Sequence, residues 1–166
     1  MSFASTSTLP ASFSWYAIRV RSRCEKKVSE NLSRQGIENY LPLITEVRQW
    51  SDRKKKVTVP AISCYVFIRV CDSQKLTVLQ GDNVVGFVCE NRINKVIPER
   101  EINAMKQALS SNRIEVSFIQ DIEIGEKVLI ESGPLKGYEG IIINRQGKRK
   151  YLVRLDNIGY SMIIEK

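Results

Sequence analysis

Apolar and polar residues alternate along several short stretches in the first two thirds of the chain, a pattern typical of half-buried β-strands. The clearest stretches are residues 15–21, 64–70 and 84–88. In the second of them Tyr65 and Phe67 share one face, because successive side chains of a strand point to opposite sides. The other face is also apolar. The stretch therefore either fills a core or leaves one apolar face for a partner. Because a short chain barely provides a cover for two apolar faces, we expect Tyr65 and Phe67 to stay exposed for a partner.

A period of three to four residues replaces this alternation in two places and predicts helices. In residues 25–32, Val28 and Leu32 lie four positions apart, and Gly36 follows where a left-handed cap is favourable. A second helix is predicted to open with Pro98 in its first turn. Its apolar positions keep the same spacing at Ile102, Met105 and Leu109.

Two strand-like runs, residues 47–50 and 55–59, flank the polar turn 51–54 and predict a hairpin with a basic tip. A charged tip of this kind either keeps the turn solvated or contacts DNA or a protein. Trp50, beside the turn, either stacks on a base or packs under the hairpin, and we expect packing.

The order of these elements predicts an α+β domain over residues 14–110, with a mainly antiparallel sheet and flanking helices. Residues 1–13 are expected to be a disordered extension and residues 111–120 a linker. Residues 121–166 contain six glycines between short β runs, which predicts a small β-barrel. Each glycine would cost about 1 kcal/mol inside a helix, so strands are expected there.

The charge is concentrated at the start of the chain. Of the net +8, residues 1–60 contribute +6, with 11 Lys and Arg against 5 Asp and Glu. This distribution favours a basic face that meets a polyanion over general solubility.

The composition argues against catalysis. The chain has no histidine, and its four cysteines are not spaced as zinc ligands are. No carboxylate pair suits acid–base work, since Glu99 and Glu101 open a helix whose dipole they complement. We therefore expect no catalytic residue, no metal and no cofactor. No apolar run is long enough to span a bilayer, and a cytoplasmic location without membrane contact is expected.

A glycine-containing motif in the C-terminal segment indicates a family. Residues 125–141 resemble the KOW motif, which NusG-type elongation factors share with several ribosomal proteins. The motif positions are Gly133, Leu135, Gly137 and Gly140.

The N-terminal segment separates these two groups, because it resembles the N-terminal domain of NusG factors in order and spacing. The matching runs are Trp15-Tyr16, Glu25-Lys26-Lys27-Val28, Tyr65-Val66-Phe67-Ile68, Val85-Gly86-Phe87-Val88 and Ile97-Pro98 with Glu101-Ile102. The inserted hairpin is most similar to the specialised RfaH- and UpxY-type antiterminators. One departure is Ile62-Ser63-Cys64, where the family often has Phe-Pro-Gly or Phe-Pro-Asn.

The resemblance implies a monomeric transcription elongation and antitermination factor without catalysis. Tyr65, Phe67 and Arg19 would then bind the clamp helices of the RNA polymerase β′ subunit. The non-template DNA of the transcription bubble would meet basic residues, which are Arg21, Arg23, Lys26, Lys27, Arg53 and Lys54. The KOW domain would recruit Rho or a small-subunit ribosomal protein. The alternative is a ribosome-associated KOW protein that binds rRNA.

Overall fold

The computed structural model describes residues 11–110, 115–119, 127–131, 135–145, 148–155, 157 and 160–165. The predicted extension therefore lies mostly outside the described residues. No helix among the residues described is long and apolar enough to cross a membrane.

The first sheet is antiparallel and is built around β1 (Ser14–Val20). Residues Ser14 to Arg19 of this strand pair with β5 (Tyr65–Val70), with Ala17 opposite Phe67. The strand order is β2 (Glu38–Tyr40), β5, β1, β6 (Val84–Phe87), and the short β9 (Val96–Ile97) also pairs with β1. The predicted strands 15–21, 64–70 and 84–88 are thus confirmed as neighbours in one sheet.

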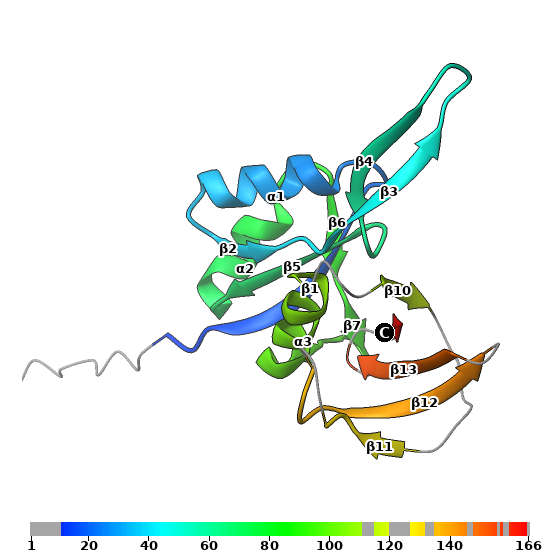
Figure 1. Cartoon of the computed structure of the whole chain (residues 1–166). Helices are drawn as coiled ribbons and strands as arrows, with labels where there is room; N and C mark the ends of the chain where they lie inside the picture. The colour runs from blue at the N-terminus through cyan, green and yellow to red at the C-terminus, as the bar shows by residue number, and fades with distance from the viewer. Residues whose placement is uncertain are drawn as a thin grey trace, which may run out of the picture.

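Helices cover both faces of this sheet (Figure 1). On one face α1 (Glu25–Arg34) and α2 (Asp72–Leu79) place Val28, Leu32 and Val78 against the sheet. On the other face α3 (Glu99–Ser110) packs Ile102 and Met105 against it. Both predicted helices are confirmed, and their apolar spacing explains which side each one buries.

The ends of α1 are fixed by local geometry. Gly36 follows the helix with φ +72°, the left-handed conformation that glycine adopts without a Cβ clash. At the other end the buried carboxylate of Glu25 accepts a hydrogen bond from the Cys64 backbone N–H at 2.8 Å. This bond joins the start of α1 to the entry of β5.

Two hairpins leave the first sheet. The larger one, β3 (Leu43–Gln49) with β4 (Lys54–Pro60), extends away from the rest of the structure in Figure 1 and confirms the predicted basic-tipped hairpin. The smaller one is β7 (Cys89–Glu90) with β8 (Ile93–Asn94).

The C-terminal segment forms a second antiparallel sheet in the order β10, β14, β13, β12, β11. These strands are Glu115–Ile119, Tyr160–Glu165, Lys148–Leu155, Glu139–Arg145 and Lys127–Leu129. The expectation of strands here is confirmed for the described residues. The structure differs over residues 115–119, which were expected in a linker and instead pair with β14 as the edge strand of this sheet.

Candidate functional site

One face of the first sheet carries aromatic side chains from three neighbouring strands. Trp15 of β1, Tyr40 of β2 and Phe67 of β5 belong to one apolar cluster. The rings of Tyr40 and Phe67 stack with centroids 6.4 Å apart, because the two residues are direct partners in the β2–β5 ladder. We call Trp15, Tyr40, Tyr65 and Phe67 the aromatic face.

Helix α3 covers part of the aromatic face and adds a cation to it. The Nζ atom of Lys106 lies 5.2 Å from the centroid of Trp15 and 5.3 Å from that of Tyr40, within cation–π range of both rings. Burial raises the pKa of the Tyr40 hydroxyl to about 12, because its charged form would be poorly solvated.

The C-terminal sheet covers the rest of the aromatic face. Tyr160 of β14 meets Tyr65 edge to face, with centroids 5.9 Å apart. Four buried apolar residues of the C-terminal segment join the same cluster, namely Ile130, Leu135, Val153 and Met162. The two sheets therefore share one core.

This arrangement corrects the expectation that Tyr65 and Phe67 stay exposed. Phe67 is 0% exposed, and Tyr65 is half-buried. The expectation assumed that a short chain could not cover both faces of its sheet. Here α1 and α2 cover one face, while α3 and the C-terminal sheet together cover the other.

Two hydrogen bonds accompany the apolar contact between the C-terminal segment and α3. The Tyr138 hydroxyl donates to the backbone carbonyl of Arg100 at 3.2 Å. Asn157 Nδ2 donates to Oε1 of the buried Glu101 at 2.7 Å. A crevice of about 550 Å³ lies beside them, lined by the start of α3 and by β11–β13. The joint is thus apolar at its centre and polar at its edge.

Arg19 lies beside the aromatic face and stays exposed. It is the direct partner of Tyr65 in the β1–β5 ladder, so both side chains point to the same side of the sheet. The structure therefore brings together the three residues predicted to bind polymerase, although only Arg19 is fully accessible.

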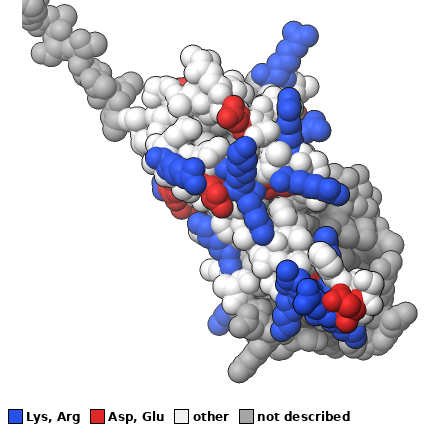
Figure 2. Space-filling view, turned by 90° about the horizontal axis from the view of Figure 1, so that it is seen from above, with Lys and Arg blue, Asp and Glu red and all other residues white. Residues whose placement is uncertain are grey.

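The basic residues after β1 lie together around the start of α1. Arg21, Arg23 and Lys27 are exposed, and Arg23 has φ 64° in the turn that leads into the helix. Lys26 donates from Nζ to the backbone carbonyl of Thr58 at 2.6 Å, which ties the helix to β4 of the hairpin. Figure 2, seen from above, shows Lys and Arg side chains outnumbering Asp and Glu on this side of the molecule.

Arg53 and Lys54 lie at the exposed tip of the hairpin, as predicted, and Arg53 pairs weakly with Asp52 at 3.6 Å. The expectation that Trp50 packs under the hairpin is wrong, since its side chain is 55% exposed. A two-stranded hairpin that extends from the domain has no second layer against which the indole could pack.

The described part of the predicted glycine motif forms a turn at residues 135–137, just before β12. Leu135 is buried, and Gly137 adopts φ +88° while its N–H donates to the Ile130 carbonyl at 2.8 Å. At Gly140 a Cβ would lie 3.3 Å from the Leu152 carbonyl, so the strands approach closely there. Gly133 lies outside the described residues.

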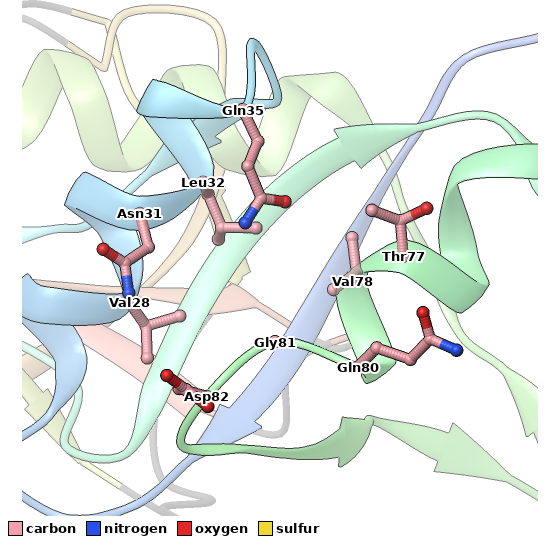
Figure 3. A pocket seen from close by; sticks show the side chains of 9 residues that line it. All are labelled: Val28, Asn31, Leu32, Gln35, Thr77, Val78, Gln80, Gly81 and Asp82. Atoms are coloured by element: carbon pink, nitrogen blue, oxygen red, sulfur yellow. The ribbon is translucent and has the colours of Figure 1, made fainter.

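A separate hollow of about 230 Å³ lies between the C-terminal ends of α1 and α2 (Figure 3). Apolar Val28, Leu32 and Val78 line it together with polar side chains, of which Asp82 is the one ionisable group. One carboxylate alone cannot form an acid–base pair. Within the described ranges no three His, Cys, Asp or Glu side chains gather as metal ligands.

Sequence reasoning missed Tyr40, Lys106 and Tyr160 as members of this site. Tyr40 sits in a short strand without clear alternation, and the role of Lys106 depends on α3 crossing the sheet at that point. Tyr160 is separated from Tyr65 by 95 positions. Local patterns do not report such distant contacts.

The fold and these surfaces define a two-part protein in which an α+β unit and a β-rich unit meet across an aromatic face. Residues 13–106, more than half of the chain, match the family model described as NusG, transcription termination factor nusG. The chain belongs to the NusG family of transcription termination and antitermination factors.

Relatives with that name match nearly the whole chain. The transcription termination/antitermination protein NusG of Staphylococcus carnosus is 26% identical over 91% of this chain and 90% of its own length. The protein of the same name from Staphylococcus aureus strain Mu50 is 29% identical over the same shares. A solved structure, "Domain interaction in Thermotoga maritima NusG", covers 92% of this chain and 93% of its own with a TM-score of 0.52 and 20% identity. That likeness concerns the fold.

Proposed function

We propose that this protein rides on RNA polymerase by docking the aromatic face and Arg19 on the clamp helices of the β′ subunit. The observation that carries the proposal is that the C-terminal sheet, and not only α3, packs into the cluster that contains Phe67 and places Tyr160 against Tyr65. The C-terminal sheet is held on the aromatic face by non-covalent contacts, so it can move away from the face. Aromatic side chains then become available as the anchors that dominate protein interfaces.

Docking requires the C-terminal sheet to move away from the aromatic face. The polymerase and the sheet compete for the same side chains. Docking therefore requires that the polymerase binds the open form more tightly than the covered form. The exposed Arg19 at the rim is available in both forms and supplies a first electrostatic contact.

The basic residues at the start of α1 hold the non-template strand of the transcription bubble. Their exposed side chains, on Arg21, Arg23 and Lys27, are placed to contact phosphates without reading bases. Lys26 keeps α1 beside the hairpin, where Arg53 and Lys54 extend the basic surface. By bridging clamp and bubble, the protein disfavours the rearranged state of a paused polymerase.

The released C-terminal sheet, closed as a KOW barrel, recruits a second factor such as Rho or a small-subunit ribosomal protein. The hairpin supports specialisation of the RfaH or UpxY type. In this view the protein acts as a monomer in the cytoplasm without a cofactor.

Capture of core RNA polymerase by the immobilised full-length protein tests the proposal. Arg19→Glu should lower the captured amount several-fold, because it reverses a charge at the rim of the docking face. Arg34→Glu makes the same change at the exposed last turn of α1 and should leave capture intact. Recovery of ribosomal subunits in place of polymerase would favour the rRNA-binding alternative.

A further inference from the structure

The β3–β4 hairpin is uncovered on both faces. All residues from 45 to 56 are exposed, including Val47 at 62% and Trp50 at 55%. An isolated two-stranded hairpin is at best marginally stable in water, and a third strand or packing against a helix is normally needed for stability. The length of this hairpin, seven paired residues on each strand, therefore indicates a contact surface.

The charge of the hairpin is suited to a polyanion. Residues 43–60 contain five basic residues, Arg48, Arg53, Lys54, Lys55 and Lys56, against Glu46 and Asp52. The two arginines pair with the two carboxylates, at 3.3 and 3.6 Å. The three lysines form no ion pair within the part of the chain that the structure describes, so their charge is available.

The indole of Trp50 is held at the tip of this surface. The backbone N–H of Trp50 donates to the Arg53 carbonyl at 2.8 Å and closes the turn. Lys55 Nζ lies 5.9 Å from the ring centroid, at the limit of a cation–π contact. The ring is thus placed by the turn and flanked by a cation, while more than half of its surface faces solvent.

We propose that Trp50 stacks on an unpaired base of a single-stranded nucleic acid, while Lys54 and Lys55 contact the flanking phosphates. The proposal deepens, and rests on, the nucleic-acid contact proposed above for Arg53 and Lys54. Aromatic platforms within basic surfaces are the general means of holding single strands without sequence preference.

A duplex and a protein fit the hairpin less well. In a duplex the base faces are occupied by stacking, so an indole meets only base edges and sugars. A protein partner would bury the lysines at the tip, and lysine is depleted from the centres of protein interfaces. The bond from Lys26 to Thr58 places the hairpin beside the basic start of α1, which gives one strand a continuous path across both.

Binding of labelled single-stranded DNA, the matching RNA and the matching DNA duplex to the full-length protein tests the proposal, with fluorescence anisotropy as the readout. Trp50→Leu, which keeps apolar bulk but removes the stacking ring, should weaken single-strand binding on the order of ten-fold. Trp50→Phe should recover most of this loss. Both variants should bind the duplex as the wild type does.

Intrinsic fluorescence gives an independent readout, because the chain has two tryptophans and the other, Trp15, is buried at 4% exposure. Single strands should quench the wild-type emission, and Trp50→Leu should abolish this quenching. Lys54→Gln should weaken binding but keep the quenching. Lys136→Gln, which changes an exposed lysine of the C-terminal segment, should leave both the affinity and the quenching as in the wild type.

Quenching by either single strand supports the proposal. The single strand that binds more tightly identifies the ligand as DNA or RNA. Unchanged single-strand affinity in Trp50→Leu, or an equal loss for the duplex, would overturn it. Capture of core RNA polymerase is measured in parallel on the two Trp50 variants and should be unchanged. A failure of the oligonucleotide assay with normal capture therefore rejects the hairpin contact alone.

Discussion

Tyr65 and Tyr160 meet edge to face with ring centroids 5.9 Å apart, which joins β5 of the first sheet to β14 of the second. Edge-to-face ring pairs contribute about 0.5–1.5 kcal/mol beyond the area they bury. The contact is therefore strong enough to bias the equilibrium between a covered and an uncovered aromatic face, and weak enough to be broken by a competing partner.

Tyr160→Ala should consequently raise the capture of core RNA polymerase several-fold, because it weakens the cover and leaves the docking residues in place. Leu129→Ala, which removes an exposed side chain from the same sheet, is the matched control and should have no effect. Lower capture by Tyr160→Ala, with an unchanged unfolding midpoint, would show that the ring supports docking instead of masking it.

The hydrogen bond from Asn157 to Glu101 offers a second way to loosen the cover. Asn157→Ala should cost about 1 kcal/mol of contact between α3 and the C-terminal segment and also raise capture. Asn157→Ser, which keeps a donor, should lie between this variant and the wild type. If Asn157→Ala changed global stability without changing capture, the bond would serve folding alone.

The elements of the first sheet could be predicted because their signals are local. Alternation fixed β1 and β5, and apolar spacing with Gly36 or Pro98 fixed α1 and α3. The cover over Phe67 could not be predicted this way, because Val153 and Met162 reach the aromatic face from far along the chain. Alternation shows that both faces of β5 are apolar but does not show what covers them.

The exposure of Trp50 illustrates the opposite error. An aromatic residue usually lies in a core, so its burial was a reasonable expectation. Burial requires a second layer, however, and the hairpin leaves the sheet before any layer covers it. The position of Arg19, in contrast, follows from the strand period, because it alternates with the buried Ile18 and Val20.

Binding to single-stranded DNA should depend steeply on salt, because each neutralised phosphate releases a counterion. Replacing Arg21, Arg23 or Lys27 with Gln should each reduce the slope of log K against log salt by about 0.7. These three residues are chosen because Lys26 already bonds to Thr58. Arg34→Gln, at the far end of α1, serves as the control and should keep the wild-type slope. If all variants kept that slope, the single strand would bind at another surface.

Cys64 occupies a left-handed conformation with φ 65° at the entry of β5. A residue with a Cβ costs about 1–2 kcal/mol there, whereas glycine costs about 0.5–1 kcal/mol in lost backbone entropy. Cys64→Gly should therefore raise the free energy of unfolding by up to about 1.5 kcal/mol in urea titrations, since the backbone bond to Glu25 is kept. Cys89→Gly, in strand β7, should lower it, and a loss of stability in both variants would contradict the argument.

The raised pKa of Tyr40 makes stability depend on pH in the alkaline range. An unfolded tyrosine ionises near pH 10, whereas burial holds the pKa of Tyr40 at about 12. Between these values the unfolded chain binds fewer protons at this residue than the folded chain does, so the free energy of unfolding falls as pH rises. The stability is fully present below pH 10 and should have dropped by about 1 kcal/mol at pH 11.

Comparing urea midpoints of the wild type and Tyr40→Phe at pH 9 and pH 11 isolates this residue, because all other groups titrate alike in both proteins. The difference between the two proteins should shift by that amount in favour of Tyr40→Phe at the higher pH, and a constant difference would show that the hydroxyl is solvated in the folded protein.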